Sequence, residues 1–222
     1  MGHAWYIDLE LADVGLLIGM TGSGKSWQID KAVSYRRARG LPTLVLDYPN
    51  ADHVGPSSCR SQYPWRELVR RPELVTDDPV LSMSVTVRDR EELPDAIAAL
   101  QAMLRYRWVR SEKRGEPVLF IIEEAGQVPT QRKGVLFDLA TLHRHAGCIP
   151  ILASQFATGV DTAIRKMATI IILMHQEYPD DVRELRDWLR SDLADQAPTL
   201  MPGDRIVWRS YRGAKLYRRQ AG

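Results

Sequence analysis

The fold is decided by one stretch near the amino terminus, Val14-Gly-Leu-Leu-Ile-Gly-Met-Thr-Gly-Ser-Gly-Lys-Ser26. Its first five residues form a short apolar run typical of a buried strand, and the rest satisfies the pattern G-x-x-x-x-G-K-[ST]. Glycines in this pattern let the backbone turn tightly and aim N–H groups at phosphate oxygens, while the following helix adds its positive dipole end. The stretch predicts a phosphate-binding loop; the alternative is a glycine turn that only joins a strand to a helix.

The ligand expected in this loop is ATP with Mg²⁺. Lys25 is expected to reach the β- and γ-phosphates, and the Ser26 hydroxyl to bind the metal ion. The residues predicted to contact the nucleotide are Gly19, Met20, Thr21, Gly22, Ser23, Gly24, Lys25 and Ser26.

The composition is that of one globular domain. The chain has 222 residues, of which 45% are hydrophobic and 26% charged, so it can bury a substantial core and is too apolar to be disordered. A net charge of +2 argues against histone-like proteins, because a polyanion would have to meet locally clustered charge. The cysteines, Cys59 and Cys148, are too few for a disulfide framework or a four-cysteine zinc site.

The sequence predicts no membrane span. The longest apolar stretches, such as 149–153 and 168–174, are far shorter than the roughly 20 residues that a membrane helix needs. The first ten residues carry acids where an export leader would carry bases. We therefore expect the chain to work in the cytosol.

Short apolar runs alternate with segments of helical period, which is typical of a parallel α/β sheet. The runs are residues 14–18, 43–46, 80–87, 118–122, 149–153 and 169–173. Apolar residues spaced by three and four predict helices with one face on the sheet. These residues are Ile97, Leu100, Leu104 and Trp108; Leu136, Leu139 and Leu142; and Val182, Leu185 and Leu189.

We predict a single doubly wound α/β domain over residues 1–222, with its core at about 14–208. A terminal hairpin is expected over 205–219, inside a basic segment at 205–222. Residues 48–80 are rich in proline and are expected to form an irregular insertion with at most a short helix near 65–71.

Two carboxylates follow one of the apolar runs, in Val118-Leu-Phe-Ile-Ile-Glu-Glu124. Nucleotide hydrolysis needs an acid at the end of a buried strand to hold the metal, and a second group to orient water. Because strand side chains alternate, Glu123 and Glu124 cannot play the same part. We assign Glu123 to Mg²⁺, through water, and Glu124 to polarising the attacking water. The alternative is an acidic junction that only stabilises a helix.

Gln155 ends another run, Ile149-Pro-Ile-Leu-Ala-Ser-Gln155. At the end of a strand its amide could sense the γ-phosphate and couple its presence to strand movement. The alternative is that Gln155 caps the following helix.

The set of motifs resembles the FtsK/HerA superfamily of ring-forming DNA-pumping ATPases. It is most similar to the genome-packaging ATPases of tailless icosahedral viruses with internal membranes and double jelly-roll capsids. The resemblance covers about residues 14–208, and about thirty residues carry it: the phosphate loop, the apolar strand ending in Glu-Glu-Ala125, His143-Arg-His-Ala-Gly147 and the strand ending in Ala-Ser-Gln155. Leu46-Asp47-Tyr-Pro49 and Leu200-Met-Pro-Gly-Asp204 also look like turns of the family.

The resemblance implies a RecA-like (ASCE) P-loop fold in which the Gln-bearing strand lies between the P-loop strand and the Glu-bearing strand. The family commonly has Asp where this chain has Glu123, so the geometry around the metal should differ. The resemblance further implies an ATP-driven translocase of double-stranded DNA, assembled as a homo-oligomeric, hexameric ring. Its implied partner is a capsid or portal-vertex protein, and its implied place is the host cytoplasm or a packaging vertex of the virion.

In such rings an Arg of one subunit completes the site of its neighbour. Arg144 is our first choice, because it lies in the segment that matches the family's Arg-His-x-Gly; Arg132 and Arg165 are the other candidates. The alternative for Arg144 is a surface cation at a helix carboxyl end. His143 and His145 are expected to be structural, since no third metal ligand stands at a suitable spacing.

Two clusters of basic residues suit sequence-independent contact with DNA phosphates, although each could also be a solvated surface. One comprises Arg205, Arg209, Arg212, Lys215, Arg218 and Arg219; the other comprises Arg105, Arg107, Arg110, Lys113 and Arg114.

Two other classes of function stay open. A small-molecule kinase of the nucleotide kinase type would share the P-loop and the size, although a Glu-Glu pair suits activated water better than an organic acceptor. The second class is a morphogenesis or conjugation-type P-loop ATPase.

Overall fold

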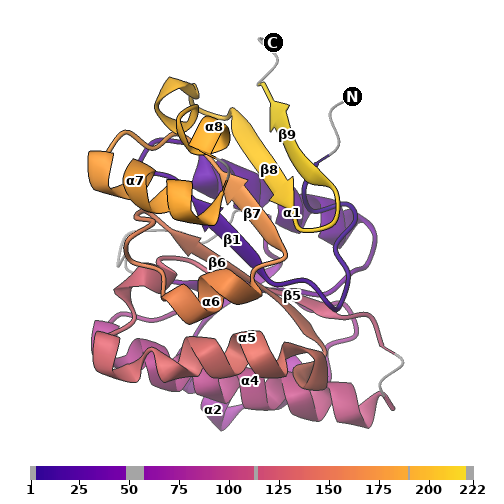
Figure 1. Ribbon diagram of the computed structural model, residues 1–222. Helices are drawn as coiled ribbons and strands as arrows, with labels where there is room; N and C mark the ends of the chain where they lie inside the picture. Colours follow the sequence, from indigo (N-terminus) through magenta and orange to yellow (C-terminus); the bar gives the residue numbers. More distant parts are fainter. Residues whose placement is uncertain (1–3, 49–57, 113–114, 190, 219–222) are drawn as a thin grey trace.

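A computed structural model describes residues 4–48, 58–112, 115–189 and 191–218. Within these residues the strands form one nine-stranded sheet in the order β3-β4-β2-β5-β6-β1-β7-β8-β9 (Figure 1). The strands are β1 (Gly15–Ile18), β2 (Thr43–Asp47), β3 (Ser61–Pro64), β4 (Ser82–Thr86), β5 (Val118–Ile122), β6 (Cys148–Ser154), β7 (Ile170–Leu173), β8 (Arg205–Arg209) and β9 (Gly213–Tyr217).

In the order of the sheet, the seven strands from the edge strand β3 to β7 are all parallel, β1 and β2 included. β8 and β9 continue the sheet as an antiparallel hairpin. The predicted α/β class, the mostly parallel sheet and the terminal hairpin are thereby confirmed. Every residue of β1, β2, β5, β6 and β7 is buried, because helices or terminal segments cover both faces of the sheet.

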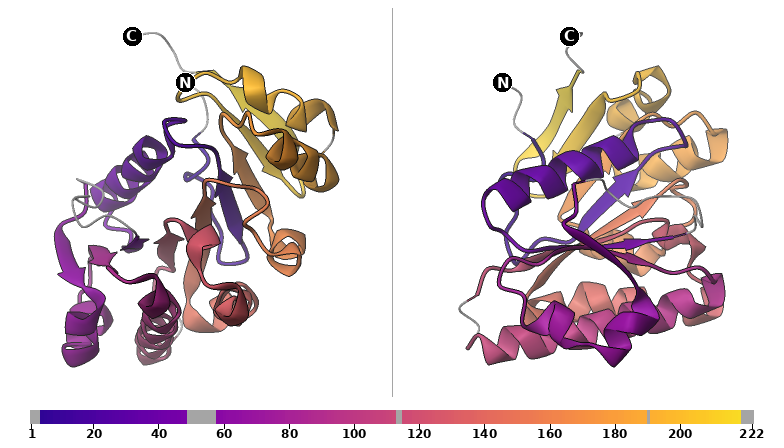
Figure 2. Two further views of the ribbon diagram at one scale, coloured as in Figure 1. Left: turned by 90° about the vertical axis from the view of Figure 1, so that its left-hand side faces the viewer. Right: turned by 180° about the vertical axis from the view of Figure 1, so that it is seen from behind.

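The helices divide unequally between the two faces (Figures 1 and 2). Apolar residues of α1 pack on one face together with Trp5, whereas the helices from α2 to α7 contribute to the larger apolar cluster on the other. The helices are α1 (Lys25–Ala38), α2 (Trp65–Arg70), α3 (Glu73–Thr76), α4 (Leu93–Arg110), α5 (Gly134–Ala146), α6 (Thr162–Met167), α7 (Pro179–Trp188) and α8 (Ser191–Ala194).

The described part of the proline-rich insertion, residues 58–80, contains a strand and two short helices, which is more regular structure than predicted. β3 adds a parallel edge strand next to β4, and α2 and α3 follow it. Pro64 can end β3 because a strand at the edge of a sheet does not need every N–H for pairing. The short helix expected near 65–71 is confirmed, and residues 49–57 lie outside the described part.

One predicted core position is wrong. Leu142 of α5 is 47% exposed, and His143 is buried in its place. The spacing from Leu139 explains the difference, because Leu136, Leu139 and His143 follow one another by three and four residues and so share one helix face.

Candidate active site

The carboxyl ends of three neighbouring strands bring the predicted site residues together. β6 lies between β1 and β5 and is parallel to both, which is the strand order that the resemblance implied. The phosphate loop follows β1, Gln155 follows β6, and Glu123 and Glu124 follow β5. All of them therefore lie at one edge of the sheet, where ligands of open α/β sheets bind.

Backbone hydrogen bonds from both neighbouring strand ends fix the start of the phosphate loop. The Gly19 N–H donates to the Ser154 carbonyl at 3.2 Å, and the Met20 N–H donates to the His175 carbonyl at 3.0 Å. Helix α1 begins at Lys25 without a side-chain cap, so its first N–H groups stay available to an anion.

The turn that precedes β8 also contacts the loop. The Gly203 N–H donates to the Ser23 carbonyl at 2.9 Å. Gly24 has a φ of 99°, and a Cβ at this position would lie only 3.2 Å from the Gly203 nitrogen. Gly24 is thus required both for its left-handed backbone and for the close approach of a distant turn.

Lys25 lies within the loop. Its Nζ donates to the carbonyls of Gly19, at 2.5 Å, and Met20, at 3.3 Å. Burial lowers the pKa of Lys25, while the carboxylates of Glu124 and Glu123 oppose that shift. The ammonium is therefore within electrostatic reach of both predicted acids.

Glu123 is the most strongly perturbed acid of this edge. Burial raises its pKa to about 8, the nearby Asp47 and Glu124 add to the shift, and Lys25 opposes it. Its Oε1 is buried and has no hydrogen-bond partner among the described residues. Asp47, the last residue of β2, is a functional candidate that the sequence analysis took only for part of a turn; its place at the end of a buried strand was the available signal.

These residues fit a magnesium ion. Glu123 and Ser26 line the same pocket, an oxygen of Glu123 lacks a partner among the described residues, and both side chains offer the hard oxygen donors that Mg²⁺ prefers. The described residues contain no cluster of His, Cys, Asp and Glu that could hold a metal ion by itself. Magnesium at nucleotide sites is usually bound by one or two protein carboxylates together with water and phosphate oxygens.

Gln155 bridges the phosphate loop and Glu124. The Thr21 hydroxyl donates to Gln155 Oε1 at 3.1 Å, and Gln155 Nε2 donates to Glu124 Oε1 at 2.9 Å. Glu124 has a φ of 52°, in the left-handed region that residues other than glycine rarely adopt. The backbone carbonyl of Gln155 in turn accepts a hydrogen bond from the fully buried Gln176, at 2.8 Å. Gln155 is thus tied to three separate parts of the chain.

Most of the predicted site residues line one pocket of about 510 Å³, whereas Gly19, Met20 and Ser23 are not part of its lining. Its lining comprises Thr21, Gly22, Gly24, Lys25, Ser26, Trp27, Asp47, Tyr48, Glu123, Glu124 and Gln155. Trp27 and Tyr48 were not anticipated.

Arg144 is not part of this pocket. It is exposed in the last turn of α5, which leads into the amino end of β6, whereas Gln155 follows the carboxyl end of that strand. Among the described residues Arg144 has no ion pair, while Arg132 pairs with Asp95 and Arg165 with Glu184.

His143 is buried, and its Nδ1 lies 2.8 Å from the Ala140 carbonyl. Burial lowers its pKa. This environment agrees with the structural role expected for His143.

Most of the described terminal basic cluster is engaged within the protein. Arg209 donates to the carbonyls of Trp5, at 2.9 Å, and Asp8, at 3.3 Å, and lies 3.8 Å from Asp13. Arg212, Arg218 and Arg205 contact Asp8, Asp204 and the Tyr217 ring, respectively. Lys215 is exposed, and Arg219 lies outside the described residues. Arg209 and Arg212 therefore hold the amino-terminal segment, whereas Arg205 and Arg218 contact residues in or next to the hairpin itself.

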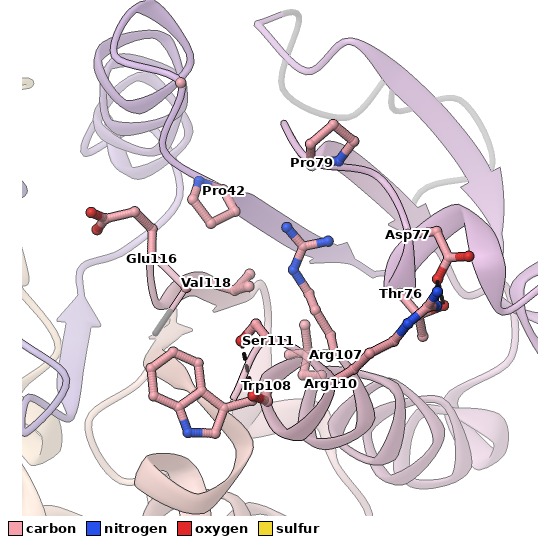
Figure 3. A pocket seen from close by; sticks show the side chains of 14 residues that line it. Pro42, Thr76, Asp77, Pro79, Arg107, Trp108, Arg110, Ser111, Glu116 and Val118 are labelled. Carbon is pink, nitrogen blue, oxygen red and sulfur yellow. Dashed lines mark hydrogen bonds and ion pairs between the residues drawn. The ribbon is translucent and has the colours of Figure 1, made fainter. Parts of the chain in front are cut away.

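The second basic cluster, which begins with Arg105, Arg107 and Arg110 of α4 and is called the helix cluster below, is also partly engaged within the protein. Arg107 donates to the carbonyls of Val75, at 3.1 Å, and Asp78, at 2.5 Å, and Arg110 pairs with Asp77 at 2.5 Å. Both side chains line a pocket of about 400 Å³ beside Trp108 and the starts of β2 and β5 (Figure 3). Arg105 is exposed, and residues 113–114 lie outside the described part.

No protein-family model matches the sequence, and no match is found among curated proteins. Solved structures do match. The genome packaging NTPase B204 of Sulfolobus turreted icosahedral virus 2, in complex with AMPPCP, has a TM-score of 0.74 at 19% identity, covering 96% of this chain and 100% of B204. VirB4 of Thermoanaerobacter pseudethanolicus has a TM-score of 0.65 at 10% identity, covering 96% of this chain and 93% of VirB4.

The cytoplasmic domain of the type VII secretion ATPase EccC of Thermomonospora curvata also matches, with a TM-score of 0.60 at 14% identity. That match covers 94% of this chain and 25% of EccC. At these identities the similarity establishes the fold, which is that of the ASCE P-loop ATPases. The resemblance to FtsK/HerA-type ATPases is confirmed as a structural match. Among the described helices, none is both long and apolar enough to cross a bilayer.

Proposed function

We propose that this chain is an ATP hydrolase that works in a ring of identical subunits and moves double-stranded DNA, packaging a viral genome into a preformed capsid. The observation that carries the proposal is the bridge from Thr21 through Gln155 to Glu124, because it joins the phosphate loop to the acid best placed to activate water. The match over the full length of a viral genome packaging NTPase supports the choice of cargo. B204 also binds ATP-gammaS, which supports ATP as the nucleotide.

The chemistry follows from the residues at the carboxyl edge of the sheet. Lys25 and the N–H groups of the loop bind the phosphates, and Ser26 and Glu123 would hold Mg²⁺, which supplies charge neutralisation on the phosphate oxygens. Glu124 orients the attacking water and accepts its proton. Gln155 reports the state of the phosphate loop to Glu124 and, through its backbone, to Gln176.

Among the described residues, no arginine lines the pocket of the site, and in the proposed ring a neighbouring subunit would supply one. Arg144 is the best candidate for an arginine supplied by the neighbouring subunit, since it is exposed and has no ion pair among the described residues. Arg132 and Arg165 would first have to leave Asp95 and Glu184.

The DNA contacts would fall to exposed basic side chains that are not engaged within the protein. Among the described residues these include Arg105 and Lys215. A ring repeats each of them once per subunit, so a net charge of +2 per chain is compatible with binding a polyanion.

A secretion or conjugation ATPase is the second candidate, favoured by the structural similarity to VirB4 and EccC. A nucleotide-type kinase is a third, which rests on the P-loop alone.

The decisive experiment measures ATP hydrolysis by the purified chain with and without linear duplex DNA, using Lys25→Ala as the inactive control. We expect hydrolysis that duplex DNA stimulates severalfold. A rate of hydrolysis that duplex DNA leaves unchanged would favour the secretion-type candidate. Phosphorylation of an added nucleoside or nucleotide would favour the kinase.

The trans arginine is tested by mixing subunits. Arg144→Ala should abolish hydrolysis in assembled rings, and rings mixed with Lys25→Ala subunits, which retain Arg144, should regain part of it. Failure of these two inactive variants to complement each other would remove the basis for Arg144.

A further inference from the structure

Trp27 is an exposed aromatic residue directly beside the phosphate loop. It is 46% exposed in the first turn of α1, directly after Ser26, while its neighbours Gln28 and Ile29 are buried. An isolated exposed aromatic residue is ordinary on a protein surface. This one, however, lines the same pocket as Lys25 and Glu123.

A lysine of the same helix contacts the indole ring of Trp27. Lys31, one turn further along α1, places its Nζ 5.5 Å from the centre of the Trp27 ring. A cation above one face of an aromatic ring is attracted by the ring quadrupole and restricts the ring's rotation. Since 46% of Trp27 is exposed, the ring still has surface to offer a flat ligand.

The position of Trp27 matches the part of a nucleotide that the phosphate loop does not bind. The loop and the first N–H groups of α1 hold phosphates. The ribose and base of the same molecule must then extend along the pocket, past the first turn of the helix. Among the residues described around this pocket, Trp27 and Tyr48 are the aromatic ones.

We propose that the Trp27 indole is the platform on which the nucleobase stacks, with Lys31 holding the ring in place. This inference rests on the proposed function, because it assumes that the phosphate loop binds a nucleoside triphosphate. An indole face attracts a base through stacking and dispersion. Trp27 therefore adds affinity for the base, and Lys25 supplies affinity for the phosphates.

The test separates base from phosphate by comparing ATP with inorganic tripolyphosphate, which has no base. Calorimetry in Mg²⁺ buffer would measure both affinities for the wild-type chain, Trp27→Ala and Trp27→Phe. Tyr106→Ala is the matched control, because Tyr106 is 59% exposed on α4 and lines no part of this pocket.

We expect Trp27→Ala to weaken ATP binding by between about fivefold and a hundredfold, the range observed for base–aromatic stacking. Tripolyphosphate should bind Trp27→Ala as it binds the wild type, Trp27→Phe should retain most of the ATP affinity, and Tyr106→Ala should change neither.

Two results would overturn the platform: unchanged ATP affinity in Trp27→Ala, or an equal loss for ATP and tripolyphosphate, which would mean that Trp27 only shapes the loop. A wild-type chain that binds neither ligand would instead refute the proposed function.

Discussion

The carboxyl edge of the parallel strands and the basic terminal hairpin treat their charged groups in opposite ways. At the carboxyl edge, three acids gather near Lys25, and an oxygen of Glu123 is buried without a partner among the described residues. In the hairpin, Arg209 and Arg218 reach acceptors of their own chain. The difference teaches that a buried charged group without a hydrogen-bond partner indicates a ligand site. A large number of charged residues close together does not by itself indicate one.

The largest effect is expected from removing the charge of Glu124. In Glu124→Gln the new amide oxygen can still accept the hydrogen bond from Gln155 Nε2, so the bridge survives and only the base is lost. Single-turnover hydrolysis should fall by about a hundredfold or more, while ATP affinity stays within a few fold. Comparable turnover in this variant would place the base elsewhere.

In the hairpin, Arg209→Ala should destabilise the fold by about 2–3 kcal/mol, because it leaves two partly buried carbonyls and the buried carboxylate of Asp13 without their cation. The Arg209 side chain is only 16% exposed. Urea unfolding measures the loss. Arg212→Ala is the control: its pair with Asp8 is exposed, so less than about 1 kcal/mol is expected. Equal losses in both variants would contradict the distinction between the two arginines.

Breaking the Gln155 bridge should have an intermediate effect on the site. Gln155→Ala removes contacts to both Thr21 and Glu124, and we expect hydrolysis to fall by about tenfold and its stimulation by DNA to disappear. Thr21→Val removes only the hydrogen bond between the phosphate loop and Gln155, so its rate of hydrolysis should fall less. Full DNA stimulation in Gln155→Ala would show that the bridge does not transmit the nucleotide state.

The smallest effect is expected at Arg110. Its ion pair with Asp77 is exposed on both sides, with side chains 58% and 48% accessible. Arg110→Ala should change the free energy of unfolding by less than about 1 kcal/mol in thermal or urea denaturation. A loss above about 2 kcal/mol in the free energy of unfolding would mean that Arg110 stabilises the fold as Arg209 does, and that its ion pair is not merely a solvated surface contact.

Much of the fold could be predicted because the relevant signals are local. A few consecutive residues are enough to recognise the phosphate loop, each buried apolar run and the acids at the end of a run. Leu142 was placed wrongly because three-residue spacing alone does not distinguish the inward face of α5 from its edge, and a buried histidine carries no hydrophobic signal. β3 was missed because Pro64 argues against a strand except at the edge of a sheet.

The partners within the site depend on contacts between distant segments, which composition and period do not encode. Asp47 joins Glu123 only because β2 lies next to β5. The engagement of Arg209 likewise depends on an amino-terminal segment about two hundred residues away in the sequence. Such pairings appear only when the chain is folded.

The position of β1 has a consequence for how the protein is made. Among the described strands β1 is the first in chain order, yet its two partners come late: Gly15 pairs with Ile151 of β6 and Ile170 of β7. Contacts between segments so far apart form slowly, and a strand that waits for them exposes its edges in the meantime. The phosphate loop also waits for Gly203 to reach Ser23. A growing chain can therefore complete the contacts of its phosphate loop only after Gly203 has been synthesised, and ATP binding would report that folding has reached this turn.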